Sequence, residues 1–327
     1  MGYADDYICE ADTVIVGRKG SINNPIFVEE PFWNVDTAFG LVAKREVLLP
    51  RYLYYFCRNY DFERLNKAVT IPSLTKSDLL KIEITLPSLE IQEKLVNKLL
   101  KIEEVIQARQ QQLQKLDELV KARFVEMLGD YIKGRGKQLS ELATITGGLT
   151  KNSKRDTFKL KMPYLRVANV FFNRLDLNEI LEIGVREEEV EKTLLQTGDL
   201  LFVEGNGSIE QIGRVAIWDG SISPILHQNH LIKARFNDRT IIPEFALFYF
   251  MSEEGRQQII SKSVSTSGLN TLSVNKIGSL ILPVPPIPLQ EQFSAFVKQT
   301  DKSKVVIQKA LDEAQVLFDS LMQQYFG

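Results

Sequence analysis

Two long stretches of the chain carry apolar residues at alternating three- and four-residue intervals. In the first stretch, residues 90–128, the seam positions are Ile102, Ile106, Leu113, Leu116 and Val120. In the second stretch, residues 286–327, they include Ile307, Leu311, Phe318 and Leu321. This spacing predicts two α-helices, each with one coiled-coil seam. The nearest partner for each seam is the other helix, so we expect antiparallel pairing along a helix of roughly 58 Å.

A shorter pattern of strands and turns precedes each predicted helix. Residues 13–16 and 200–203 are typical of strands, and both end in glycine-rich turns. Pro50 and Pro243 each predict the start of a short amphipathic helix, because proline fits the first helical turn. A last strand is expected in each copy, at residues 82–86 and 280–284. Each module is therefore predicted to be α+β, and prolines hinge it to its long helix.

The two halves of the chain are copies of one unit. Residues 71–95 align with residues 269–293 at a constant offset. Upstream, ADTVIVGRKGSI (11–22) resembles GDLLFVEGNGSI (198–209), and LLPRYLYYF (48–56) resembles IIPEFALFY (241–249). Similarity at a fixed offset indicates an internal repeat. The expected order is a first module at 1–87, a central helix at 88–130, a second module at 133–285 and a terminal helix at 286–327.

Composition excludes several classes of protein. Hydrophobic residues make up 44% of the chain and charged residues 25%, as in ordinary globular proteins. Cys9 and Cys57 are the only cysteines, which supports neither a disulfide framework nor a zinc site. His227 and His230 have no clear third ligand nearby, so no metal is expected. No stretch approaches the ~20 apolar residues of a membrane span and no signal-peptide pattern is present, so we expect a cytoplasmic protein with no membrane partner.

Charge is unevenly distributed along the chain, although the net charge is only −2. Residues 133–174 include ten basic residues, beginning with Lys133, and two acidic ones, whereas residues 176–191 reverse the sign. One face of a module can therefore be positive, as is typical of nucleic-acid binding. A solvated basic surface that binds no ligand is the alternative interpretation.

Several strings of the repeat resemble a known family. They are PYLRVANV (163–170), TGDLLFVEGNGSIEQIGRVAI (197–217), HQNHLIKARF (227–236) and the helix entries LPSLEIQEK (86–94) and LPVPPIPLQEQ (282–292). Their order over essentially the whole chain resembles the specificity subunit of type I restriction-modification systems. The resemblance implies an α+β fold in which two α/β target-recognition domains are separated by two long antiparallel coiled-coil helices.

The resemblance also implies a function without catalysis. Members of the family read a bipartite double-stranded DNA site, one half per domain, and their helices fix the spacer and dock two methyltransferase (modification) subunits. Those partners carry S-adenosylmethionine and the methyl-transfer chemistry, and separate restriction or motor subunits cut DNA. No catalytic residue, cofactor or metal is therefore expected in this chain.

Candidate DNA contacts are the polar side chains of the predicted turns and of the basic segment. Lysine and arginine contact phosphates, while amides, hydroxyls and guanidinium groups read base edges. In the first module the candidates are Arg18, Lys19 and Asn23. In the second module they are Lys151, Lys154, Arg155, Arg166, Asn169, Asn206, Ser208, Arg214, Asn229, His230 and Asn270.

Other interpretations compete with this one. A methyltransferase would need a Phe-x-Gly-x-Gly cofactor loop and an Asn-Pro-Pro motif, and the sequence contains neither. A coiled-coil adaptor that binds only protein shares the helices, but it does not explain why the modules differ more than the helix entries do. The first module also lacks a counterpart of residues 134–187. The alternative to two equal readers is therefore a partly inactive, truncated subunit. In it the second module reads its half-site, while the first has an uncovered sheet edge and is impaired unless its missing part comes in trans.

Overall fold

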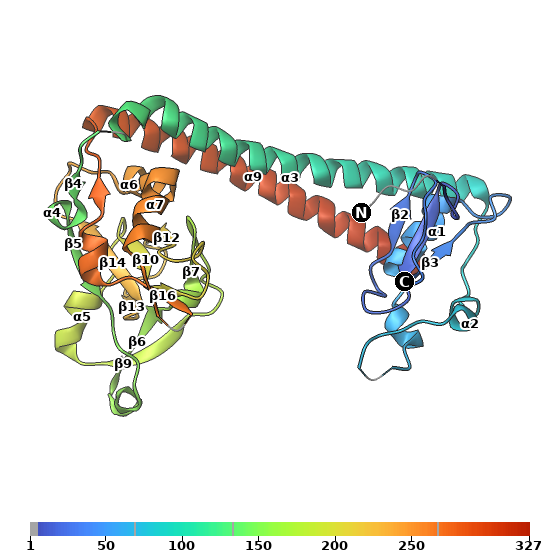
Figure 1. The fold of residues 1–327 in the computed structure, drawn as a ribbon, viewed down its shortest axis with the longest axis horizontal. Helices are drawn as coiled ribbons and strands as arrows, with labels where there is room; N and C mark the ends of the chain where they lie inside the picture. Colours follow the sequence, from blue (N-terminus) through green and yellow to red (C-terminus); the bar gives the residue numbers. More distant parts are fainter. Residues whose placement is uncertain (1–5, 69, 133, 267) are drawn as a thin grey trace. The chain divides into compact units, whose positions relative to one another are not determined.

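The chain forms two compact units. The computed structural model describes residues 6–68, 70–132, 134–266 and 268–327 (Figure 1). Unit 1 consists of Met1–Gln114 with Lys304–Gly327, and unit 2 consists of Lys115–Ser303. The two long helices, α3 (Leu89–Ile132) and α9 (Ile287–Phe326), each contribute one part to each unit. Each unit therefore contains one module together with the helix segments that pack on it.

The module of unit 1 is a three-stranded antiparallel sheet with a helix against it. Its strands have the order β2-β1-β3 and are β1 (Thr13–Gly17), β2 (Ile26–Val28) and β3 (Ala38–Leu41). The helices are α1 (Pro50–Asn59), the 3₁₀ helix η1 (Phe62–Leu65) and the short α2 (Lys76–Leu79). Val14 and Val16 of β1 point to the same face of the strand and pack in the core with Leu74.

The module of unit 2 contains several small sheets. The largest is antiparallel, with the order β12-β10-β14-β5: Val215–Ile217, Leu200–Val203, Leu231–Phe236 and Ala143–Gly147. Two more are β13-β6-β9 (Leu226–His227, Leu160–Leu165, Leu181–Val185) and β11-β16-β15 (Gly205–Asn206, Leu269–Thr271, Val264–Thr266). Two strand pairs complete it, β17 (Ile281–Leu282) with β4 (Lys137–Gln138) and β7 (Val170–Phe171) with β8 (Arg174–Leu175).

Short helices connect these strands. They are α4 (Leu139–Leu142), η2 (Ser153–Thr157), η3 (Val167–Asn169), α5 (Glu187–Thr193), α6 (Pro243–Met251), α7 (Glu253–Lys262) and α8 (Val274–Gly278). Of these, α6 is the counterpart of α1, because both start at a proline that follows an extended residue.

Strand β10 is buried on both faces and separates two cores of unit 2. Leu200 and Phe202 belong to the core that includes α6 and the long-helix segments, whereas Leu201 and Val203 belong to a second core around Trp218. Successive side chains of a strand point to opposite faces, so an unbroken apolar run is what a strand between two layers requires. The loop that follows β10 therefore starts from one of the most firmly packed positions in the unit.

Aromatic side chains attach the module of unit 2 to its helix segments. The ring centroid of Phe124 on α3 lies 5.2 Å from that of Phe293 on α9 and 6.0 Å from that of Phe245 on α6. Phe248 of α6 meets Phe293 edge to face, at 5.2 Å and 87°, a geometry that aromatic pairs favour. Val120, one of the predicted seam residues, is buried in the same core.

In unit 1 the first part of α3 packs against the last part of α9, antiparallel to it (Figure 1). Leu95 and Leu99 of α3 share a buried cluster with Tyr52 and Tyr55 of α1 and with two predicted seam residues of α9, Phe318 and Leu321. The predicted residues Ile102 and Ile106 are partly buried against this cluster. The other predicted seam residues are half-buried: Leu113, Leu116, Ile307 and Leu311.

The fold class predicted from the sequence is confirmed, with two corrections to the strands. Strands form at Thr13–Gly17 and Leu200–Val203, and helices start at Pro50 and Pro243. The expected strand at 82–86 is wrong, and of residues 280–284 only Ile281–Leu282 form a strand. A strand forms only where a neighbouring segment pairs with its backbone N–H and C=O groups. Strand β4 supplies one to β17, whereas no described segment pairs with residues 82–86.

Replacing Phe124 by alanine should test the aromatic attachment in unit 2. We expect Phe124→Ala to lower the free energy of unfolding of this unit by about 3–5 kcal/mol, because a large buried side chain leaves a cavity. Val125→Ala is the matched control, since Val125 is 63% exposed on the same helix and its truncation should change stability by about 0.5 kcal/mol or less. Urea unfolding followed by circular dichroism measures both. Equal decreases in stability would contradict this packing.

Candidate nucleic-acid interface

Three loops of unit 2 are joined into one polar surface. They are residues 148–152 after β5, residues 204–208 after β10, and residues 228–230 between β13 and β14. Asn229 donates its backbone N–H to Leu149 O at 3.0 Å, and Glu204 donates its backbone N–H to His230 O at 2.9 Å. Because backbone groups make these connections, several side chains of the loops remain exposed to solvent.

Close backbone approach at Gly148 permits one of these connections. A Cβ atom on Gly148 would lie 2.1 Å from the carbonyl oxygen of His227, which is shorter than any real contact. The next residue, Leu149, is buried and donates its N–H to the same oxygen at 2.8 Å. Glycine at 148 therefore allows the loop that carries Lys151 to pack directly on the neighbouring chain segment.

Six of the predicted contact residues lie on or beside this surface with accessible side chains. Lys151, Lys154, Ser208 and His230 are exposed, and Asn206 and Asn229 are half-buried. His230 Nδ1 lies 2.7 Å from Glu204 Oε2, so the carboxylate orients the imidazole. Amines, hydroxyls, amides and imidazoles are the groups that contact phosphates and read base edges.

Two predicted asparagines are engaged within the protein instead. Asn169 is buried, accepts a hydrogen bond from Arg166 N at 2.8 Å and donates to Asp176 O at 2.8 Å. Asn270 is also buried and donates to Asn206 O at 3.3 Å and Gly207 O at 3.2 Å. Their DNA contact stays a prediction, while these hydrogen bonds give both a structural role in holding the loops.

Arg166 and Arg214 are half-buried, and Arg214 lies beside the Phe171 ring, which the sequence interpretation missed. Arg166 pairs with Glu179 at 2.5 Å, and Arg214 donates to Val167 O at 2.9 Å. The Arg214 guanidinium also lies 5.2 Å from the ring centroid of Phe171, within the range of a cation–π contact. Burial lowers the pKa of Arg214 below its usual value. The sequence signal for this contact is the pair of consecutive phenylalanines Phe171-Phe172 within the basic segment. A search for charged residues alone does not find it.

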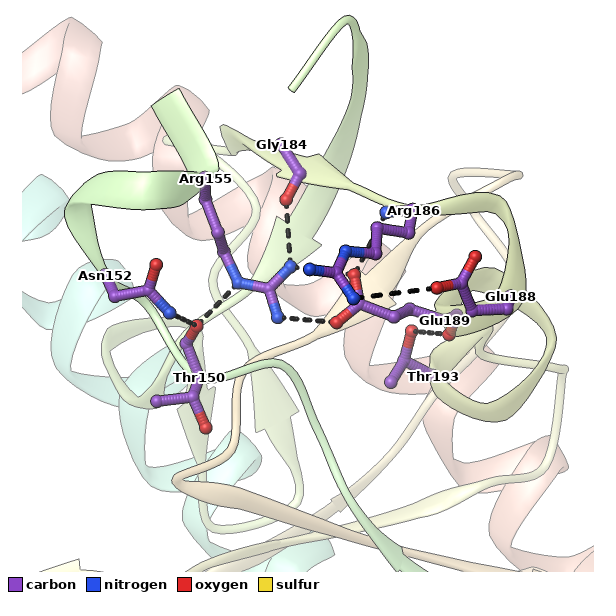
Figure 2. Close-up of polar contacts among 8 residues, drawn as sticks. All are labelled: Thr150, Asn152, Arg155, Gly184, Arg186, Glu188, Glu189 and Thr193. Carbon is purple, nitrogen blue, oxygen red and sulfur yellow. Dashed lines mark hydrogen bonds and ion pairs between the residues drawn. The ribbon is translucent and has the colours of Figure 1, made fainter. Parts of the chain in front are cut away.

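Arg155, predicted as a DNA contact, is buried and lies at the centre of a network of hydrogen bonds (Figure 2). Its Nε donates to Thr150 O at 2.6 Å, and one terminal nitrogen donates to Gly184 O at 3.0 Å. Both terminal nitrogens donate to the Glu189 carboxylate, at 2.9 and 3.0 Å. The guanidinium therefore joins the Lys151 loop to the end of β9 and to α5. Its contact with DNA stays a prediction, and its surroundings indicate that it positions the loop.

The Glu189 carboxylate is matched to this role. Its Oε2 also accepts the backbone N–H of Arg186 at 3.0 Å, closing the first turn of α5. The hydrogen bonds from Arg155, above all, hold the pKa of Glu189 below its usual value, because they favour the charged form. The Arg155 side chain is 8% exposed and that of Glu189 29%, so the pair is only partly screened by water.

In unit 1, the predicted residues lie on the turn after β1. Arg18 and Lys19 are exposed, and the Arg18 guanidinium lies 5.9 Å from the Phe39 ring centroid. Asn23 is exposed but accepts a hydrogen bond from Phe62 N at 2.7 Å and donates to Asp61 at 3.1 Å. The first two side chains are therefore accessible to a ligand, and Asn23 ties its loop to η1.

Three further expectations from the sequence concern Lys133, a metal site and a membrane-spanning helix. Lys133, the first residue of the basic segment, lies outside the described residues. Across residues 6–327, apart from 69, 133 and 267, no three His, Cys, Asp or Glu side chains are grouped as a metal site requires. In the same described parts of the chain, no helix is long and apolar enough to cross a membrane.

His227 is buried beneath the loop surface. Its Nδ1 lies 2.9 Å from Leu231 O, and because a carbonyl only accepts, Nδ1 carries the proton. Its Nε2 is buried and has no hydrogen-bond partner among the described residues. Burial lowers the pKa of His227 to about 4, so the ring is neutral at pH 7. A neutral ring also suits the neighbouring Lys233 ammonium.

The fold and the surface define a class of protein with two related modules, each bearing polar loops and each packed on segments of long helices. The family model described as Type I restriction modification DNA specificity domain matches residues 1–118 and 136–314, which together make up most of the chain. The chain belongs to this family. The resemblance inferred from the sequence is therefore confirmed.

Known proteins of similar sequence have matching descriptions. The specificity subunit of the type I restriction enzyme EcoKI from Escherichia coli (strain K12) is 24% identical over 334 residues, which cover 94% of this chain and 70% of that protein. The putative specificity subunit of the type I restriction enzyme MjaX from Methanocaldococcus jannaschii is 27% identical over 188 residues, which cover 57% of this chain and 43% of that protein.

Solved structures support the fold. A type I restriction-modification system S subunit from M. genitalium aligns with a TM-score of 0.60 at 18% identity, covering 100% of this chain and 86% of that one. A chain from a study of complex assembly and conformational transition of the type I R-M system has a TM-score of 0.55 at 17% identity, covering 97% of this chain and 82% of that one.

Replacing Arg155 by methionine should show its bracing role. We expect Arg155→Met to destabilise unit 2 by about 2–3 kcal/mol at pH 7, below the usual cost for a fully buried pair because Glu189 is partly exposed. The matched control is Arg186→Met, which removes a side chain that is 63% exposed and should change stability by about 0.5 kcal/mol or less. Urea unfolding measures both changes, and equal destabilisation by the two variants would contradict the bracing role.

The same variant has an expected pH dependence. The folded-state pKa of Glu189 is lowered, so its stabilising contribution is present above the unfolded pKa of about 4.3 and is lost as pH falls through the folded value. The stability difference between wild type and Arg155→Met should therefore shrink when unfolding is measured at pH 3 instead of pH 7. An equal stability difference at pH 3 and pH 7 would show that Arg155 does not lower the pKa of Glu189.

His227 should make the stability of unit 2 depend on pH at values above those at which Glu189 titrates. Its pKa is about 4 in the folded chain but about 6.5 when unfolded, so the unfolded state gains a proton first as pH falls. Stability should fall below pH 6.5 by at most about 1.4 kcal/mol per pH unit. His227→Asn keeps a donor for Leu231 O without titrating, and its unfolding midpoints between pH 7 and 5 should change less. Parallel curves would exclude His227 as the source.

Proposed function

We propose that this chain is the DNA-specificity subunit of a type I restriction-modification complex, and that each module reads one half of a bipartite double-stranded site. The observation that carries the proposal is the double match of the specificity domain, once on each copy of the module and helix. Two related readers on one chain suit a site with two halves, as for other DNA-binding proteins with paired modules.

The loop surface of unit 2 supports DNA reading physically. Lys151 is exposed on a loop that Arg155 holds through Thr150 O, and Lys154 is exposed on η2, which follows that loop. Their ammonium groups can therefore meet phosphates without rebuilding the loop. His230 and Ser208 lie on neighbouring loops and offer an imidazole and a hydroxyl. Such groups read base edges when a fixed framework presents them in the major groove. In unit 1, Arg18 and Lys19 are the corresponding candidates.

Chemistry is assigned to partners in this proposal. The partners are two methyltransferase subunits, which hold S-adenosylmethionine, and motor subunits that cut DNA. The chain itself binds and positions, and it catalyses nothing. Exposed apolar residues on the unit 1 segment of α9 support docking of another protein: Val305, Val306, Val316 and Leu317. Apolar groups gathered on an exposed surface are typical of protein contacts.

The test is DNA binding by the chain assembled with its methyltransferase subunits. Selection from random duplexes should enrich one sequence with two specified halves and an unspecified gap. Replacing Lys151 and Lys154 by alanine should weaken binding to all duplexes to a similar extent. It should also reduce the slope of log K against log salt by about 0.9 for each phosphate that is no longer neutralised. His230→Ala should instead relax the preference at one base position.

Lys302→Ala is the matched control, because Lys302 is an exposed lysine on α9 and belongs to none of these loops. It should leave binding and its salt dependence unchanged. If the assembled complex binds no duplex, DNA reading is rejected, and an adaptor that binds only protein becomes the better account. If the complex selects a site but the lysine variants bind like wild type, the proposed surface is rejected while the specificity function stands.

A further inference from the structure

The helix entries of both copies contain a glutamine that the loop surface does not use. Gln92 near the start of α3 and Gln290 near the start of α9 occupy equivalent positions in the repeat, and the exposed fraction of each is 0%. A fully buried amide has to find partners for its oxygen and its nitrogen, since an unsatisfied polar group is costly. Both copies satisfy this requirement in the same way.

In unit 2, Gln290 joins three segments of the chain. Its Oε1 accepts the backbone N–H of Ile242 at 2.9 Å, and its Nε2 donates to Thr240 O at 3.0 Å and to Pro285 O at 2.8 Å. Ile242 is the residue before α6, and Pro285 lies between β17 and the start of α9. One side chain therefore connects the long helix, the proline-led helix and the exit from the module.

In unit 1, Gln92 makes the same three hydrogen bonds. Its Oε1 accepts the backbone N–H of Leu49 at 2.9 Å, and its Nε2 donates to Val47 O at 2.9 Å and to Pro87 O at 2.8 Å. Leu49 precedes α1 as Ile242 precedes α6. The recurrence of the whole pattern in two modules of different sequence indicates that it is a property of the junction and not of either module.

The junction needs such a connection because prolines remove backbone donors from it. Proline has no N–H, and Pro285, Pro286 and Pro288 lie close together where the chain enters α9. The aromatic and aliphatic packing next to it is attractive in many orientations, whereas hydrogen bonds to three fixed backbone groups are directional. The glutamine therefore supplies the directional part of the attachment.

We propose that Gln92 and Gln290 are positioning residues that fix the direction in which each long helix leaves its module. The positioning role itself does not depend on the proposed function. Only its consequence rests on that function: the direction of the helix sets how its module meets a DNA half-site. Each glutamine acts within its own unit, so each can be tested separately.

Hydrogen exchange in the wild-type chain tests whether the connection forms. The amides of Leu49 and Ile242 lie outside the regular helical ladder and donate to the glutamine side chains, so they should exchange about tenfold or more slowly than exposed loop amides. Exchange at loop rates for both would overturn the proposal, and this measurement does not depend on any variant folding.

Distances within unit 2 test positioning directly. Nitroxide labels at Glu191→Cys on α5 and Gln299→Cys on α9 report the module and the helix, in a full chain that also carries Cys9→Ala and Cys57→Ala. We expect a narrow distance distribution that becomes about twofold broader in Gln290→Met, which fills the same space without the hydrogen bonds. Gln292→Met, an exposed neighbour on the same helix, should leave it narrow.

Unit 1 provides the reciprocal control. The distribution between labels at Glu30→Cys and Gln107→Cys should broaden in Gln92→Met and stay unchanged in Gln290→Met. A folded Gln290→Met chain that keeps its narrow unit 2 distribution would overturn the proposal and assign positioning to packing alone. If the distances behave as expected but the assembled complex reads no DNA, the proposed function fails while the positioning role stands.

Discussion

The burial that holds each module on its long-helix segments is the interaction on which the rest of the structure depends. In unit 1, Tyr55 of α1 packs with Leu99 of α3 and Phe318 of α9, and in unit 2, Phe245 of α6 packs with Phe124 and Phe293. A long helix in water gains most of its stability from packing an apolar face. Helix and module therefore stabilise each other, and the proline-led helix is the shared element.

Apolar burial holds the parts of each unit together, and hydrogen bonds define their orientation. The glutamine hydrogen bonds give orientation at the junction, and the Arg155 network does the same for the loop that carries Lys151. A planar guanidinium with five donors is suited to joining several acceptors, whereas a flexible ammonium is suited to phosphates. Within the basic segment, Arg155 is buried as a brace, whereas Lys151 and Lys154 are exposed.

The sequence predicted those features whose signal is local or repeated. The helix period, the proline helix starts and the duplication are all visible in short windows, and the structure contains them. The strand expected at 82–86 failed because a strand depends on a partner that its own pattern does not identify. The burial of Arg155 depends on Glu189, 34 residues away, and no local pattern reports that pairing. The glutamines lie in the helix entries that align between the two copies, but the sequence does not indicate their backbone partners.

The two copies keep their attachments alike and differ in their loops. Asp12 pairs with Arg45 at 2.8 Å in unit 1, and its repeat equivalent Asp199 pairs with Arg235 at 2.7 Å in unit 2, next to equivalent glutamine connections. In contrast, the residues that follow the first strand of the repeat are Arg18-Lys19 in one copy and Gly205-Asn206, which form β11, in the other. These residues follow buried strands in both copies. Loop side chains can therefore change what a module contacts while the packing and hydrogen bonds that hold the module on its helix stay the same.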